Sequence, residues 1–212
     1  MTSLSNGNYV VISPDWDNGA SADAGAVTWA NGNIGSSGEV TSANSLVGVT
    51  ANDRIGSLGV TSLGNGGYVV NSPQWSDGSI VFAGAVSWAN GITGLVGEVT
   101  AANSLVGTRS GDSVGDGGVF LVGNGNYLVV SSLWNNGAIE SAGAVSFGRG
   151  SIGIFGPITA LNSVRGSEAH RGNSLVSAYD ASRDTLIVGQ PAANLVSLFK
   201  TDLLFKSGFE QE

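Results

Sequence analysis

Residues 61–119 read TSLGNGGYVVNSPQWSDGSIVFAGAVSWANGITGLVGEVTAANSLVGTRSGDSVGDGGV, and this stretch decides the fold because it repeats residues 2–60. Laid over one another without a gap, the two stretches are identical at 35 of 59 positions. The period continues into a third stretch, as three sets of residues show: Tyr9, Tyr68 and Tyr127; Trp16, Trp75 and Trp134; Gly25, Gly84 and Gly143. A period of this length predicts supersecondary units that stack or form a ring, not one irregular globule.

Each repeat predicts four short strands joined by turns. In the second repeat the strands are expected at residues 59–63, 68–72, 83–89 and 97–106. Gly64–Gly67 tolerate positive φ and form a turn, Pro73 closes the second strand, and Asn90-Gly91 is a favoured hairpin turn. No segment shows a sustained helical period, so the chain is predicted to be all-β.

A four-stranded antiparallel unit with a long period is the sequence form of a β-propeller blade. We therefore expect a β-propeller of three full repeats and a shortened fourth, with a β-solenoid as the alternative. The expected blades cover about residues 2–58, 59–117, 118–172 and 173–200, and residues 201–212 form a C-terminal tail. Pro14, Pro73 and Pro191 keep the register, which places Leu186-Ile187-Val188 on the strand of Tyr68 and makes 195–199 the third strand.

Blades bury their apolar faces only against neighbours, so an open arc would expose two faces. Two solutions are expected to be possible. The chain closes by itself as a four-bladed ring, or several chains complete a larger ring or a fibre.

Composition excludes several classes of protein. The formal net charge is −8 and no basic cluster exists, so nucleic acid is not an expected partner. There is no cysteine, which excludes disulfides and thiolate metal sites, and no stretch has the roughly 20 apolar residues of a membrane span. A chain rich in Gly, Asn and Ser is typical of a bacterial exported protein, so we expect a secreted or cell-surface location. The start lacks the features of a signal peptide, which suggests a fragment of a longer precursor.

Three short motifs resemble the FG-GAP repeat of integrin alpha chains and bacterial surface propellers. They are Asp112-Ser113-Val114-Gly115, DTLIVGQP at 184–191, and Gly84-Ala85-Val86, and their repeated order covers most of residues 2–200. The chain also resembles bacterial adhesin repeats that carry NGNYVV, SPxW and AGAVTW. The resemblance implies a propeller that serves in binding or adhesion at a cell surface.

One departure from the FG-GAP pattern concerns calcium. FG-GAP loops often hold the ion with several aspartates, but the matching turns here, at 5–8, 64–67 and 123–126, contain no carboxylate. Calcium takes about 6–8 oxygen ligands, usually including carboxylates. We therefore expect no metal and no cofactor, with Asn taking the turn conformation instead.

Aromatic rings beside amide and carboxylate groups are what a sugar site needs. Trp16, Trp75 and Trp134 follow the strand that carries the repeated tyrosine and stand next to turns that contain Asn18, Asp77 and Asn136. These six residues are the candidate ligand-binding set. The competing interpretation is that a repeated tryptophan packs between neighbouring sheets, as is expected for the three repeated tyrosines.

The chain offers little catalytic chemistry. His170 is the one histidine, and Glu39 and Glu98 recur by repeat symmetry, which separates them by a whole unit. Asp53 and Asp112 are expected to cap turns by accepting backbone N–H bonds. The repeated Asn44, Asn103 and Asn162 are expected to bond backbone at a strand bend, and the repeated glycines to allow close backbone approach. No catalytic residue is predicted, so the chain is not expected to be an enzyme.

Two functions remain open at this point. The first is a non-catalytic extracellular module that presents propeller loops to a glycan or protein ligand. The second is a structural unit of a filament or large adhesin, a homo-oligomer in which contact between repeats is the function. A carbohydrate-active enzyme is the third and weakest alternative.

Overall fold

The computed structural model describes residues 1–201 of the 212-residue chain, as strands joined by turns and three single-turn 3-10 helices. The predicted tail therefore lies, apart from Thr201, outside the described residues. Over residues 1–201 no α-helix is formed, in agreement with the all-β prediction. No helix in this part of the chain is long and apolar enough to span a membrane.

Four sheets hold the seventeen strands, and they correspond to three repeats and a short fourth unit. The first sheet has the order β1 (Thr2–Ser3), β2 (Tyr9–Ser13), β3 (Ala26–Ala30), β4 (Leu46–Val47) and β8 (Gly97–Glu98). The second has β5 (Val60–Ser62), β6 (Tyr68–Ser72), β7 (Ala85–Ala89), β9 (Ser104–Val106) and β13 (Gly156–Pro157). The third has β10 (Gly118–Leu121), β11 (Tyr127–Ser131), β12 (Ala144–Gly148) and β14 (Ser163–Arg165). The fourth has β15 (Val176–Asp180), β16 (Thr185–Gln190) and β17 (Leu195–Lys200). The 3-10 helices are η1 (Gly123–Gly125), η2 (Gly172–Ser174) and η3 (Pro191–Ala193).

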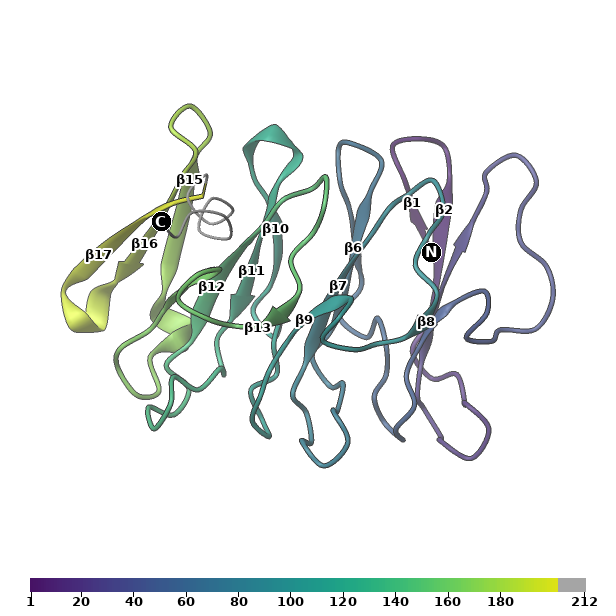
Figure 1. Ribbon diagram of the computed structural model, residues 1–212, viewed down its shortest axis with the longest axis horizontal. Helices are drawn as coiled ribbons and strands as arrows, with labels where there is room; N and C mark the ends of the chain where they lie inside the picture. The colour runs from purple at the N-terminus through teal and green to yellow at the C-terminus, as the bar shows by residue number, and fades with distance from the viewer. Residues whose placement is uncertain (202–212) are drawn as a thin grey trace, which may run out of the picture.

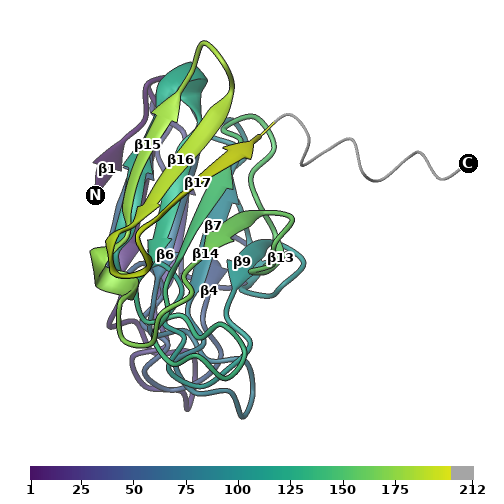
Figure 2. The same cartoon turned by 90° about the vertical axis from the view of Figure 1, so that its left-hand side faces the viewer.

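The four sheets stand side by side in a row. Figure 1 shows the first sheet at one end and the fourth at the other, and in Figure 2 the sheets lie one behind another. Residues 1–201 therefore do not close into the ring that the sequence left open. Three full repeats and a shortened unit are confirmed, but the row has two free ends.

Three apolar clusters fill the spaces between the sheets. Between the first two sheets, Val10 and Val27 pack with Tyr68, Val70 and Trp75. The second cluster has Val69 and Val86 against Tyr127, Val129 and Trp134, and the third has Phe147 and Val145 against Leu186 and Val188. Because the strand period is two, each inner sheet sends one set of residues forward and the other set back. The repeated tyrosines Tyr68 and Tyr127 are core, as predicted, whereas the prediction is wrong for Tyr9, which is only partly buried because no sheet covers it within residues 1–201.

One predicted element is divided in two. Residues 97–106 were expected to be one strand, but they form β8 and β9, separated by a turn. β9 completes its own sheet, whereas β8 pairs in parallel with β4 of the preceding repeat, with Leu46 opposite Gly97. β13 of the third repeat pairs with β9 in the same way. The second and third repeats thus each add a short strand to the sheet before them, which fastens neighbouring repeats along one edge.

Candidate functional site

The long loops that follow β2, β6 and β11 lie together along the lower edge of the row in Figure 1, and they carry the predicted ligand-binding set. In each loop the Trp backbone N–H donates to the last serine of the strand, at 3.1 Å for Trp75 and Ser72. The Trp carbonyl then accepts from the repeated glycine, at 2.9 Å for Gly84. The same two bonds recur in the first and third repeats. The loop edge is therefore a periodic structure.

The rings of Trp75 and Trp134 pack inside the molecule. Their exposed fractions are 2% and 5%, and both rings belong to the apolar clusters between sheets. A buried ring offers no face for stacking on a sugar, so the packing interpretation holds for these two residues. Trp16 is half-buried, because no sheet precedes the first one in the described chain.

Two of the three polar residues in the predicted set bond to the protein's own backbone, and the third is exposed to solvent. The side-chain amides of Asn18 and Asn136 donate to the carbonyl oxygens of Gly48 and Gly166, both at 2.9 Å. These amides are therefore occupied by the loop itself. Asp77 takes the equivalent position in the second repeat and is exposed. The structure does not bring the six residues together in one site, since they recur along the row.

A polar hollow of about 490 Å³ opens at the loop edge where the second and third repeats meet. Its lining includes Arg109, Leu133, Asn135, Glu140 and Ser141. The hollow departs from repeat symmetry, because the positions of Arg109 and Glu140 are Thr50 and Ala22 one or two periods earlier. Arg109 and Glu140 were not among the residues predicted from the sequence. The signal that could have found them is a change of charge between equivalent positions: Thr50, Arg109 and Glu168 are equivalent, as are Ala22, Val81 and Glu140.

Hydrogen bonds within the protein fix the Arg109 and Asn135 side chains that line the hollow. Asn135 donates from its backbone N–H and its side-chain amide to one oxygen of Asp112, at 3.0 and 2.7 Å. The Arg109 guanidinium donates to the Gly137 carbonyl. Glu140 is exposed and its carboxylate lies 3.8 Å from Nε2 of His170. The free polar chemistry of the hollow is therefore that of an exposed carboxylate beside an imidazole.

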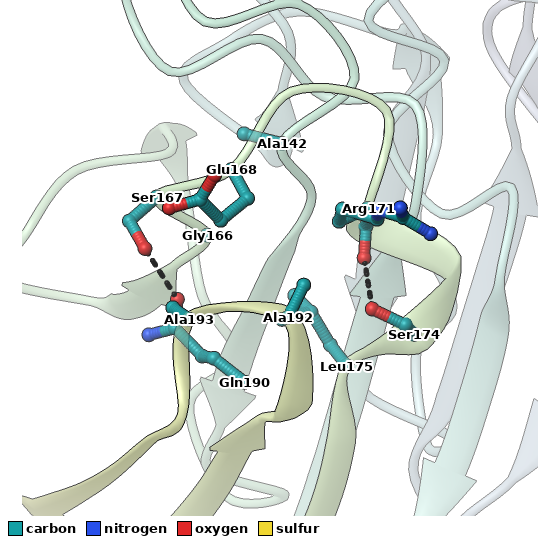
Figure 3. Close-up of a pocket in the computed structure, with 10 residues that line it drawn as sticks. All are labelled: Ala142, Gly166, Ser167, Glu168, Arg171, Ser174, Leu175, Gln190, Ala192 and Ala193. Carbon is teal, nitrogen blue, oxygen red and sulfur yellow. Dashed lines mark hydrogen bonds between the residues drawn. The ribbon is translucent and has the colours of Figure 1, made fainter.

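Two further cavities lie in the third repeat and at its junction with the fourth unit. One, of about 310 Å³, is mostly apolar and is lined by residues that include Phe147, Ile154, Phe155 and Leu161. The other is shown in Figure 3, where Ser167 donates to Gln190 and Ser174 to the Arg171 carbonyl. Its volume is about 10 Å³. That is room for about one water molecule, so this cavity is a packing gap.

The junctions between repeats carry the most regular polar chemistry in the molecule. At the first junction, Asn6 Nδ2 and Trp29 Nε1 both donate to the carbonyl oxygen of Gly91, at 2.8 and 2.9 Å. At the second, the equivalent Asn65 and Trp88 donate to Gly150, at 2.7 and 2.9 Å. The repeated Asn of each turn, expected only to shape the turn, thus reaches the next repeat.

Asp53 and Asp112 fasten the opposite edge of each junction. One oxygen of Asp53 accepts from the Val49 and Thr50 backbone N–H groups, at 3.1 and 2.9 Å, which confirms the predicted cap. The other oxygen accepts from the Ser76 N–H of the next repeat at 2.9 Å. Burial raises the pKa of Asp53 above its ordinary value, while these backbone bonds act in the opposite direction.

The remaining repeated residues also act on the backbone. Asn103 donates to the Glu98 carbonyl at 2.9 Å and accepts from the Thr100 N–H at 2.9 Å, and Asn44 and Asn162 make the same pair of bonds. The predicted role of this asparagine is confirmed. In the described residues no three His, Asp or Glu side chains gather as metal ligands would.

The comparison with protein families agrees with the repeat structure. A family model described as a repeat of unknown function, DUF5650, matches three times in tandem, at residues 3–57, 62–116 and 121–174. The match names this repeat and not the FG-GAP repeat, so the prediction of a tandem repeat family is confirmed only at that level. No curated protein matches the chain. Because the three matches cover most of the sequence, the chain belongs to the DUF5650 repeat family.

Proposed function

We propose that the chain is a non-catalytic structural segment of an extracellular filament or large adhesin, in which contact between repeats is the function. The supporting observation is that the periodic residues make their hydrogen bonds to the neighbouring repeat. The Asn, Trp and Asp that recur every 59 positions make hydrogen bonds across repeat junctions. A repeat whose recurring side chains are used on its neighbours is specialised for stacking.

The free ends of the row support association with other chains. A sheet buries its apolar face only against a neighbour, and the row leaves one face of the first and of the fourth sheet without one (Figure 1). Association at these ends extends the row into a fibre, and it is also the route by which such sheets form a propeller ring of several chains. The acidic, cysteine-free composition supports a secreted or cell-surface setting in a bacterium.

The test is the mass of the purified chain in solution as a function of concentration, measured by light scattering and sedimentation velocity. We expect the average mass to rise steadily with concentration, because contacts between chains are weaker than the covalently linked junctions within one chain. A monomer mass at every concentration would sink the proposal.

A second candidate function is the binding of a polar ligand, either glycan or protein, at the loop edge. The hollow at the second junction supports it, because Arg109 and Glu140 line this hollow at positions where the first repeat has Thr50 and Ala22. Binding on a glycan array that Arg109→Ala and Glu140→Gln abolish, and that Asp77→Asn leaves unchanged, would favour this candidate. An array without binding by the folded chain would count against its glycan form.

A further inference from the structure

The forward side of the first sheet is built like a repeat junction, but within residues 1–201 no sheet packs against it. This leading face consists of Tyr9, Val11 and Trp16, with Ser13 and Thr28 beside them. Val11 is 37% exposed, whereas its equivalents Val70 and Val129 are fully buried under the preceding sheet. The residues that every other full repeat covers are therefore half-exposed here.

The backbone at this end also lacks hydrogen bonds that the later repeats make to the sheet before them, within residues 1–201. In the second repeat the N–H groups of Gly97 and Val99 donate to the Ser45 and Val47 carbonyls of the first, at 3.0 and 3.2 Å. The equivalent segment 38–40 forms no such pair within residues 1–201, and 38–39 is not a strand. Figure 1 shows the connection from β3 to β4 reaching beyond the first sheet at the end of the row.

The far end of the row presents an apolar sheet surface of a different kind. This end face consists of Val176, Ala178, Ile187, Val196 and Leu198 on the outer side of the fourth sheet. Ala178, Ile187 and Leu198 lie opposite one another across the three strands, and Val176 and Val196 flank Gly189. Val176, Val196 and Leu198 are 59%, 64% and 71% exposed. The alternate residues Leu186 and Val188 are buried against the third repeat.

We propose that the leading face of one copy of this chain binds the end face of a second copy, head to tail. A second copy is the expected partner because its end face would extend the same sheet-on-sheet packing that joins the repeats within one chain. A leading face elsewhere in the molecule always receives the apolar side of a sheet, as Tyr68 and Val70 receive Val10 and Val27. The end face is an apolar sheet surface at the other end of the same row (Figure 1).

Charge favours this pairing over a contact of like with like. Asp15 and Asp17 flank Trp16, and Asp15 forms an ion pair with Arg54, so two leading faces in contact would bring two Asp17 carboxylates, which have no cationic partner within residues 1–201, to one interface. Like charges held close together oppose association. The end face is bordered instead by the exposed Lys200 at the end of β17, and Asp180, two strands across the sheet from it, forms an ion pair with Arg183. Because the two faces differ, the contact is heterologous and repeats from copy to copy, which produces an open chain.

The proposal rests on the proposed function, and the test separates the two. Val11→Lys blocks the leading face, and Leu198→Lys blocks the end face. Both positions are exposed, so each variant is expected to fold, which circular dichroism checks. We expect the wild-type chain to form a concentration-dependent series of sizes, and each variant alone to stay monomeric.

The decisive sample is an equal mixture of the two variants. Each retains the one face that the other has lost, so the mixture should form a dimer and nothing larger. Ile92→Lys, an exposed apolar position on a loop of the second repeat, is the matched control and should associate like the wild type.

Each other result overturns the inference in a recognisable way. Dimers of Leu198→Lys alone would show leading faces binding one another, and dimers of Val11→Lys alone would show end faces doing so. If the wild type associates and neither variant changes its mass, the inference fails while the proposed function stands. A monomeric wild type would remove both.

Discussion

At the scale of single residues, a buried carboxylate links neighbouring repeats at each of the first two junctions. Asp53 is buried and joins three backbone N–H groups from two repeats, and Asp112 repeats most of this arrangement. Each oxygen of Asp53 accepts at least one of these bonds, so oriented N–H dipoles compensate the charge. The sequence predicted the cap within one repeat, but not the bond to the next repeat. That bond depends on how the two sheets dock.

Asp53→Asn should destabilise the fold by about 1–3 kcal/mol. The amide has one acceptor oxygen in place of the two carboxylate oxygens, so at least one buried N–H group loses its partner. The free energy of unfolding from urea titration measures the effect. Asp77→Asn makes the same chemical change at an exposed position and should stay within about 0.5 kcal/mol of the wild type. Equal effects of the two substitutions would show that the junction bond adds nothing.

The buried tyrosines predict the behaviour at alkaline pH. Burial raises the pKa of Tyr68 to about 12, and it raises the pKa of Tyr127 as well. The unfolded chain releases these protons near pH 10. Between about pH 10 and about pH 12 the folded state thus holds more protons, and the free energy of unfolding falls as the pH rises.

Urea titrations across that pH range measure the slope. Tyr68→Phe should reduce it, and the double variant Tyr68→Phe/Tyr127→Phe should reduce it further, because phenylalanine has no proton to lose. A slope that survives in the double variant would assign the alkaline loss of stability to other groups.

At the scale of elements, a glycine precedes β3, β7 and β12, and it lets the start of each of these strands approach the backbone of the loop that leads into the next repeat. Gly84 has φ +75°, and a Cβ built there would lie 2.0 Å from the Val114 backbone nitrogen. Gly25 and Gly143 are equally close to backbone atoms of Ile55 and Gly172. The predicted close backbone approach is therefore confirmed in all three repeats.

Gly84→Ala should cost more than about 4 kcal/mol or prevent folding, because backbone atoms cannot yield as a flexible side chain does. Gly78→Ala is the matched control, since Gly78 also has positive φ, +58°, but open space around it. The control should lose only the roughly 1–2 kcal/mol of a left-handed alanine. Thermal unfolding followed by circular dichroism compares them, and similar losses would mean that the conformation, not the close approach, requires glycine.

The elements that sequence could predict are those with a local pattern. YVVNS and AVSWA alternate between the two faces of a sheet and end at recognisable turns, so β6 and β7 lie where the pattern places them. β8 is two residues long, and its partner is the preceding repeat. Nothing within 97–106 distinguishes one strand from two, because the division depends on a neighbour. The six candidate ligand residues were limited in the same way, since burial between sheets decides what a tryptophan does.

At the scale of the whole molecule, the repeat predicted the number of sheets but not their path. A ring and a row have the same strands, turns and apolar periodicity within each unit. They differ in the small rotation between neighbouring sheets, which the junction residues of two repeats determine together. Whether the ring closes therefore depends on a geometry that a single repeat does not specify. Within residues 1–201, one face of the first sheet and one face of the fourth have no neighbouring sheet (Figure 1).

A row also predicts that stability is not uniform along the chain. The second and third sheets are covered on both faces, whereas the first and fourth are covered on one. Local opening exposes less buried surface at the ends, so hydrogen exchange should be slowest in β6, β7, β11 and β12 and faster in β2, β3 and β16. Exchange followed by mass spectrometry at low concentration measures this order. If the chain associates end to end, β2 and β16 should slow as concentration rises while β6 and β11 do not change. Equal protection of all four sheets at low concentration would instead indicate one cooperative unit, in which the free ends carry no local weakness.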